Sequence, residues 1–344
     1  MMLRDGRLFG RKAGAFTLQW HLTNACELSC LHCYDRTRLG CLPLAQAEKI
    51  LDDFLAFCHR KRVAPQLCLT GGNPFLYPHF LQLYRAAATA GCAISMLGNP
   101  VTEERLAEIV ELRVPTYFQV SLEGRREYND RIRGAGHFDR VLAFLPLLRK
   151  WQVRSQVMLT LHQENLAELV PLAVELAGQV DRFTFNRLSQ VGAGANLHLP
   201  GKREYVELLK DYVVAARSHP HLGFKDGLFN VMRHHFGRPL TRGCTGFGCG
   251  AAFNFVAVLP DGQVHACRKF PSPIGNLLES SLADIYASRA ARRYRRGSRA
   301  CRCCRLRNRC GGCLAVTHGA GLPELRARDP HCFMRERKAL LAPF

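Results

Sequence analysis

Apolar positions along the first two thirds of the chain follow two different periods. Short apolar runs predict strands, and they cover residues 16–22, 66–69, 93–97, 116–122, 153–161 and 182–188. The stretches between them carry apolar residues at every third or fourth position and predict helices, over residues 44–58, 80–90, 103–112, 138–148, 165–177 and 205–214. Pro146 lies inside one of these stretches, and it predicts a kink or an early end there.

Six strands that alternate with helices predict a parallel sheet with right-handed crossovers. Because a closed barrel of this kind has eight units, we expect an α/β fold with a partial (β/α)6 barrel similar to a TIM barrel. Ligands of parallel α/β folds lie at the carboxyl ends of the strands. Three polar segments follow strands in this chain: the loop after residue 22, the turn 71–74 and the segment 121–124. We therefore expect these segments to share one rim of the barrel.

Three cysteines lie in the loop that follows the first predicted strand. Cys26, Cys30 and Cys33 are spaced C-x3-C-x2-C, and three thiolates can hold a four-iron cluster by three of its irons. The clusters of electron carriers are normally closed by four cysteines, so an open fourth iron favours chemistry at the cluster. A structural zinc site is the alternative, but zinc takes four ligands, and His32 and Cys41 are the nearby candidates for the fourth.

The segment from Thr23 to Tyr34, which contains these cysteines, resembles the radical SAM superfamily. The resemblance implies a partial (β/α)6 barrel and an open iron that binds the amino and carboxylate groups of S-adenosylmethionine. It also implies reductive cleavage of that cofactor to a 5′-deoxyadenosyl radical, which removes a hydrogen from the substrate. By the same resemblance, the expected contacts to S-adenosylmethionine are Tyr34, Gly71, Gly72, Asn73, Ser121 and Arg133.

Two of these expected contacts involve a substitution or an alternative. Family members usually carry Gly-Gly-Glu-Pro at the turn where this chain has Asn73, whose amide oxygen can accept a hydrogen bond from the methionine ammonium without a full charge. The segment 121–139 resembles the peptide-modifying branch, which implies that Ser121 and Arg133 contact the ribose or the carboxylate. The alternative for Arg133 is a surface ion pair with Asp130 or Asp139.

Nine further cysteines lie between residues 244 and 332, and the spacing of eight of them resembles a SPASM domain, the auxiliary-cluster extension of radical SAM enzymes. The resemblance implies two interleaved [4Fe–4S] clusters. The first auxiliary group would be Cys244, Cys249, Cys267 and Cys313, and the second Cys301, Cys304, Cys310 and Cys332. Cys310 and Cys313 are one residue closer than the family's usual spacing. Cys303 lies beside Cys304 and could replace a neighbouring cysteine as a cluster ligand. Zinc knuckles are the alternative.

A tight turn at Asp261-Gly262 predicts a hairpin between 253–259 and 264–267, which would deliver Cys267. Cys58, Cys68 and Cys92 lie in apolar runs and are expected to be inert core residues. We expect four regions: an N-terminal extension (1–15), the barrel (16–235), the SPASM domain (236–335) and a C-terminal tail (336–344).

Composition limits the location and the partners. The chain has sixteen cysteines and no recognisable export signal or apolar run of membrane-spanning length, so we expect a cytoplasmic protein with metal sites rather than disulfides. Eleven thiolates and three cluster cores would lower the formal charge of +20 to about +15. Ten arginines fall between Arg289 and Arg309, but Tyr294 is the one aromatic among them, so a nucleic-acid partner is not favoured.

Together these features predict a radical SAM oxidoreductase that modifies a ribosomally made peptide, by a crosslink or a heterocycle. Auxiliary clusters can accept the electron that such an oxidation releases. The run from His265 to Asn276 resembles small-peptide maturases, in particular the thio(seleno)oxazole-modification type. Expected partners are the peptide, a separate leader-recognition protein and a reductase such as flavodoxin or ferredoxin. A sulfatase-maturing enzyme, a tetrapyrrole-modifying enzyme and a non-catalytic electron carrier remain alternatives.

Overall fold

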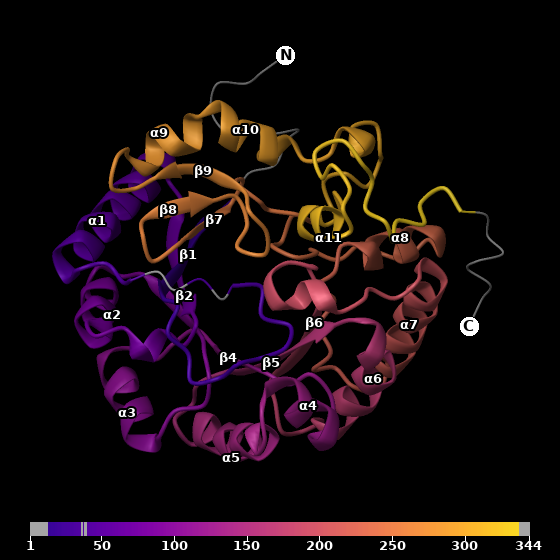
Figure 1. The fold of residues 1–344 in the computed structure, drawn as a ribbon, viewed down its shortest axis with the longest axis horizontal. Coiled ribbons are helices and arrows are strands. Elements are labelled where there is room, and N and C mark those ends of the chain that lie inside the picture. The colour runs from indigo at the N-terminus through magenta and orange to yellow at the C-terminus, as the bar shows by residue number, and fades with distance from the viewer. Residues whose placement is uncertain (1–12, 36, 38–39, 337–344) are drawn as a thin grey trace.

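The computed structural model describes residues 13–35, 37 and 40–336. Six parallel strands form the predicted sheet, paired in chain order. They are β1 (Ala15–Thr23), β2 (Ala64–Gly71), β3 (Ala93–Leu97), β4 (Phe118–Ser121), β5 (Ser155–Leu161) and β6 (Arg182–Arg187). The strands curve around a common centre (Figure 1), so the predicted partial (β/α)6 barrel is confirmed.

Six helices cover the outside of this curved sheet (Figure 1). They are α1 (Leu44–Lys61), α2 (Phe80–Thr89), α3 (Glu103–Leu112), α5 (His137–Lys150), α6 (Leu166–Glu175) and α7 (Lys202–Ala215). The predicted early end of one helix is wrong, because α5 continues through Pro146 to Lys150. Pro146 lies on the exposed face of the helix, where water can satisfy the carbonyl group that loses its donor.

Two helices of the first 235 residues were not predicted: α4 (Arg126–Arg133) and α8 (Leu228–His235). In α4, Asn129 and Ile132 are the two buried residues, so the segment lacks the apolar stripe that normally signals a helix. The helix places Arg133 at its last turn, immediately before Gly134, which has a φ of 108°. Its position beside the rim therefore depends on tertiary contacts rather than on its own sequence.

The C-terminal residues extend the barrel sheet instead of forming a detached unit. The predicted hairpin is present as β7 (Phe255–Val258) and β8 (Gln263–His265), and β9 (Pro273–Asn276) pairs beyond it. β7 pairs in parallel with β1, which gives a nine-stranded order of β6-β5-β4-β3-β2-β1-β7-β8-β9. The helices of this region are α9 (Leu282–Ala287), α10 (Arg289–Arg296) and α11 (Leu314–Gly319).

The three cysteines expected to be core residues are all buried, but one of them lies on the other side of the sheet. Cys58 and Cys92 are buried in the hydrophobic core between sheet and helices. Cys68 is also buried, as expected, but it lines the cavity inside the barrel and does not lie between sheet and helices. Alternate residues of a strand face opposite sides of the sheet. Leu67 and Leu69 therefore pack in the core, while Cys68 faces inward.

Of the expected extensions, residues 1–12 and 337–344 lie outside the described residues. Within the part of the chain that the structure does describe, no helix has both the length and the apolar character needed to cross a membrane.

Candidate functional site

The predicted rim exists, and two glycines bring its segments together. The backbone N–H of Gly72 donates to the carbonyl of Thr23 at 2.8 Å, and that of Asn73 donates to the carbonyl of Ala25 at 2.7 Å. A Cβ added at Gly71 or Gly72 would lie only 2.3 or 2.2 Å from these carbonyl oxygens. The glycines thus permit close approach between β2 and the cysteine loop, which is a structural reason for them besides contact with a ligand.

The three loop cysteines lie on this rim beside two nitrogen donors. The Nη1 atom of Arg133 lies 3.8 Å from the Sγ atom of Cys30, and the Nδ2 atom of Asn99 lies 3.6 Å from the Sγ atom of Cys26. Burial raises the pKa of Cys30 although Arg133 lowers it, and metal binding would displace the thiol proton. A cluster binds each thiolate through a different iron. The three cysteines and their cationic neighbour therefore suit an anionic iron–sulfur cluster.

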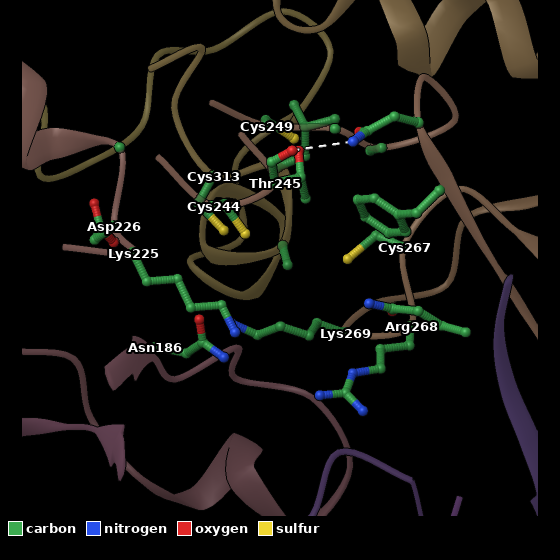
Figure 2. A pocket seen from close by; sticks show the side chains of 18 of the residues that line it. Asn186, Lys225, Asp226, Cys244, Thr245, Cys249, Cys267, Arg268, Lys269 and Cys313 are labelled. Carbon is green, nitrogen blue, oxygen red and sulfur yellow. Dashed lines mark hydrogen bonds between the residues drawn. The ribbon is translucent and has the colours of Figure 1, made fainter. Parts of the chain in front are cut away.

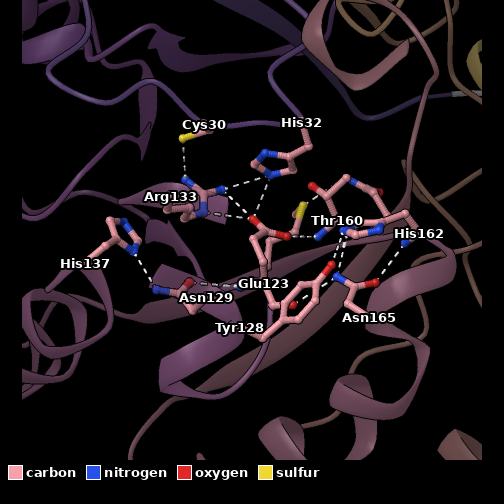
Figure 3. A network of polar contacts seen from close by, with 12 residues as sticks. Cys30, His32, Glu123, Tyr128, Asn129, Arg133, His137, Thr160, His162 and Asn165 are labelled. Atoms are coloured by element: carbon pink, nitrogen blue, oxygen red, sulfur yellow. Dashed lines mark hydrogen bonds and ion pairs between the residues drawn. The ribbon is translucent and has the colours of Figure 1, made fainter. Parts of the chain in front are cut away.

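A buried carboxylate, Glu123, holds the cysteine loop against the barrel (Figure 3). It accepts a hydrogen bond from the Nε atom of Arg133 at 2.9 Å and lies 2.9 Å from the Nε2 atom of His32. Its other oxygen accepts from the backbone N–H of Thr160 at 2.7 Å. Burial would raise the pKa of Glu123, but His32, Arg133 and the Thr160 hydrogen bond together hold it below its usual value. Glu123 is therefore ionised and fully paired.

This network corrects the alternative expected for Arg133. Its ion pair is with Glu123, and not with Asp130 or Asp139. Asp130 instead accepts hydrogen bonds from the backbone N–H groups of Gly136 and Phe138. Asp139 pairs with Arg126. The physical reason is that Arg133 points inward from the end of α4, while the Asp130 carboxylate accepts the backbone hydrogen bonds of the turn that follows this helix.

Asn73 presents its amide group to a neighbouring carboxylate. Its Oδ1 atom accepts a hydrogen bond from the backbone N–H of Phe75 at 3.3 Å, so its Nδ2 atom faces the cysteine loop. There Nδ2 donates to both carboxylate oxygens of Glu27, at 2.9 and 3.1 Å. Asn73 is buried and Glu27 is exposed. A carboxylate therefore lies beside Asn73 at this rim, on the residue after Cys26.

The remaining expected cofactor contacts also lie on the rim. Tyr34 follows the last loop cysteine, and its hydroxyl group lies 3.5 Å from the Nε2 atom of His21. Burial raises the pKa of Tyr34 to about 12. Ser121 is the last residue of β4 and is partly exposed. Both side chains are thus placed where a ligand at the carboxyl ends of the strands could reach them.

The first auxiliary group comes together at the wall of an internal cavity (Figure 2). Its cysteines all line this cavity, and they are Cys244, Cys249, Cys267 and Cys313. The pKa of Cys249 is raised to about 12 and that of Cys267 to about 11, mainly by burial and also by the neighbouring cysteines of the group. Four thiols that share one wall can close a cluster.

The second auxiliary group comes together in the C-terminal loops. Its cysteines line one small cavity, and they are Cys301, Cys304, Cys310 and Cys332. Burial raises the pKa of Cys301 to about 11, and the nearby Cys332 and Cys304 contribute to the same shift. Cys303 is exposed and does not line that cavity. Cys310 also lines the first cavity, so the interleaved pairing that the sequence resemblance implies, like the role of these cysteines as ligands, stays a prediction.

A buried arginine that the sequence did not point out joins the barrel to both auxiliary groups. Arg187 ends β6, and it donates to the two carboxylate oxygens of Asp329 at 2.7 and 2.8 Å and to Asp226 at 2.8 Å. Asp329 in turn accepts from the backbone N–H of Cys313 at 2.8 Å. The pKa of Asp329 is lowered because Arg187 and these hydrogen bonds outweigh its burial. The network fixes the position of Cys313.

Comparison with known proteins agrees with this arrangement. The model of the radical SAM superfamily matches residues 20–176, and that of the SPASM iron–sulfur cluster-binding domain matches residues 249–311. An AdoMet-dependent heme synthase of Methanosarcina barkeri is 26% identical over 93% of this chain and 97% of that protein. A mycofactocin maturase of Mycobacterium tuberculosis is 30% identical over 94% of this chain and 84% of that protein.

The fold is also found among solved structures. Streptococcus suis SuiB bound to its precursor peptide SuiA superposes with a TM-score of 0.71 at 16% identity, over 93% of this chain and 76% of that chain. The extent of the mycofactocin maturase match, together with the two family models, establishes the family. This protein is an enzyme of the radical SAM superfamily with a C-terminal SPASM domain, and it uses S-adenosylmethionine and [4Fe–4S] clusters.

Proposed function

We propose that this enzyme oxidatively modifies a ribosomally made peptide and holds three [4Fe–4S] clusters. The observation that carries the proposal is the shared cavity, which runs from the inner face of the barrel to the first auxiliary group. A substrate in that cavity would lie beside the first auxiliary group, whose cluster could accept an electron from it. The maturase relative, 30% identical over most of both chains, supports a peptide substrate.

The cofactors, when bound, supply reductive cleavage of S-adenosylmethionine to a 5′-deoxyadenosyl radical. The protein's own residues position and shield that chemistry. Glu123 and Arg133 hold the cysteine loop, and Arg133 places a cation beside Cys30. Tyr34, Gly71, Gly72, Asn73 and Ser121 are the rim positions at which we place S-adenosylmethionine.

The test of this function begins with anaerobic reconstitution using iron and sulfide, followed by dithionite and S-adenosylmethionine. Three clusters predict about twelve irons per chain together with formation of 5′-deoxyadenosine. About four irons with product would leave the C-terminal cysteines to zinc, and no product at full iron loading would favour an electron carrier. Mass spectrometry of a candidate precursor peptide, incubated with the active enzyme, then shows whether the peptide loses hydrogen.

The Glu27 carboxylate should serve as the acceptor for the methionine ammonium. Changing Glu27 to Gln removes a charge next to that ammonium, and a hydrogen bond to a charged group contributes about 1.5–3 kcal/mol. We therefore expect S-adenosylmethionine to bind roughly 10- to 100-fold more weakly, as measured by equilibrium dialysis of the reconstituted enzyme. Glu48→Gln on α1 is the control, since Glu48 is exposed and does not belong to the three rim segments. Equal binding by both variants would refute this role for Glu27.

The two auxiliary groups predict separable clusters. Changing Cys301 to Ala should remove about four irons per chain, because the group at the first cavity does not contain this residue. Cleavage of S-adenosylmethionine without substrate should persist, while substrate oxidation should fall. Iron analysis and 5′-deoxyadenosine assays measure both. Loss of all the iron would show that the clusters do not assemble independently.

A tetrapyrrole substrate is the second candidate, and the heme synthase relative supports it, with 26% identity over nearly the full length of both proteins. Its propionate groups would also suit the basic charge of the chain. Incubation of the active enzyme with iron coproporphyrin III distinguishes the two candidates. Loss of mass from propionate side chains, with no change in any precursor peptide, would replace the peptide proposal.

A further inference from the structure

A cavity of about 350 Å³ connects the barrel interior to the first auxiliary group. Gln19 of β1 and Gln66 and Cys68 of β2 line its barrel end, while Cys244 and Cys267 line the other end. Its volume lies at the lower end of the range of ligand pockets, roughly 300–1,000 Å³. It therefore has room for one end of a substrate rather than for a folded chain.

Besides Arg187, which donates to Asp226 and Asp329, three cationic side chains line this cavity: Lys225, Arg268 and Lys269. Lys269 donates from Nζ to the backbone carbonyl of Arg187 at 2.7 Å. The Nζ atom of Lys225 lies 3.6 Å from the sulfur of Met158. Figure 2 shows Lys225 and Lys269 meeting near Asn186, whereas the guanidinium group of Arg268 points away from the cysteines.

These cations have no carboxylate partner among the described residues. Among the residues that the structure describes, Asp226 is the one carboxylate that lines the cavity. Its Oδ2 atom accepts from Arg187 at 2.8 Å, and its Oδ1 atom accepts from the backbone N–H of Leu228 at 2.8 Å. Buried charges are costly unless they are paired. A cavity with three cations and one committed carboxylate is therefore suited to receive an anion.

The three cations have different neighbours. Lys269 interacts with Cys244 and Cys267, so the thiolates of a cluster would be its partners. Lys225 interacts with both Cys244 and Arg268, and it therefore lies between the two ends of the cavity. Arg268 instead extends toward the rim, and its Nη1 atom donates to the Oγ1 atom of Thr70 at 3.1 Å. Its strongest electrostatic neighbours are tyrosine and cysteine side chains, with Tyr34 and Cys68 first among them. Most of the five guanidinium N–H donors thus remain for a ligand.

We propose that Arg268 binds a carboxylate group of the substrate at the barrel end of this cavity, with Lys225 as the second cation. The fork of a guanidinium group matches a planar carboxylate. The inference rests on the proposed function and narrows its substrate to one that inserts a carboxylate-bearing end. The carboxylate has two sources, the C-terminus of a peptide or a propionate of a tetrapyrrole.

Isothermal titration of the reconstituted enzyme under anaerobic conditions, without reductant, tests this site. One pair of probes is N-acetylated trialanine and its C-terminal amide, and the other is coproporphyrin III and its tetramethyl ester. We expect the acid of one pair to bind roughly 10- to 100-fold more tightly than its neutral partner, and the pair that shows this preference identifies the source. Arg268→Gln should remove the preference, while Arg305→Gln, a change at an exposed arginine, should preserve it.

Two further variants separate this role from a structural one. Arg268→Lys keeps the charge without the fork and should keep part of the preference for the acid, and Lys225→Gln should weaken it. Equal binding of acid and neutral probes by the unaltered enzyme, or a preference that survives Arg268→Gln, would overturn the proposal. Iron content and substrate-free cleavage of S-adenosylmethionine are measured on each protein. If cleavage fails while the preference holds, the proposed function is refuted and the carboxylate site stands.

Discussion

Replacement of Cys26, Cys30 and Cys33 by Ala should reduce the formation of 5′-deoxyadenosine to the level of a protein-free reaction. The three residues are the cysteines of the rim loop, and Arg133 and Asn99 donate toward their sulfurs. Without the thiolates, the cluster that delivers the electron has no protein ligand. We expect the iron content to fall by about four atoms per chain, while the auxiliary groups keep theirs. Product is counted by liquid chromatography after anaerobic incubation with dithionite.

The matched control changes Cys41 and Cys303, two exposed cysteines outside all three groups, to Ala. This variant should keep both its iron and its cleavage activity. Cleavage retained by the triple variant would refute the assignment of the rim loop. A triple variant that loses all of its iron would instead show that the auxiliary clusters depend on the rim loop for their assembly.

The barrel could be predicted from the sequence because its signals are local. Apolar runs such as 93–97 and helical periods such as 103–112 coincide with β3 and α3. The rim could be predicted because ligands of parallel sheets lie at the carboxyl ends of the strands, a general property that depends on no single residue. The helix α4 escaped prediction because its sequence is charged, and its single buried apolar residue gives no periodic signal.

The contacts within the site could not be predicted, because they join residues far apart in the sequence. Asn73 and Glu27 are 46 positions apart, and Arg187 and Asp329 are 142 apart. Spacing carries no information on such pairs. Two signals were nevertheless available: Glu123 lies inside the segment that resembles the family, and Arg268 directly follows Cys267. The attachment of β7 to β1 was not predictable either, since a hairpin does not specify which sheet edge it joins.

Changing Glu123 to Gln should destabilise the protein by about 3–5 kcal/mol, the cost of removing one partner from a buried ion pair. The substitution keeps the shape of the side chain but leaves Arg133, which is 11% exposed, without its carboxylate. It also alters the contact to His32, inside the cysteine loop. We therefore expect iron to be lost from the rim cluster as well. Urea-induced unfolding and the iron retained per chain measure the two effects.

The difference in stability between the unaltered protein and Glu123→Gln should depend on pH, and the sign of this dependence follows from the pKa of Glu123. The pKa of Glu123 is lowered in the folded protein, so its contribution is fully present above the pKa of an unfolded glutamate, about 4.3. It is lost as the pH falls through the lower folded value. The stability difference between the unaltered protein and Glu123→Gln should thus stay constant from neutral pH down to about pH 5.5 and shrink below about pH 4.

Glu164→Gln provides the control, because Glu164 pairs with Arg131 and the two side chains are 46% and 57% exposed. Exposed pairs contribute about 1 kcal/mol or less, so this variant should remain close to the unaltered protein. The double variant Glu123→Gln/Arg133→Met removes the unpaired cation and should recover part of the lost stability. If Glu123→Gln and Glu164→Gln lose similar stability, the buried pair does not hold the cysteine loop, and Glu123 does not act as a positioning residue.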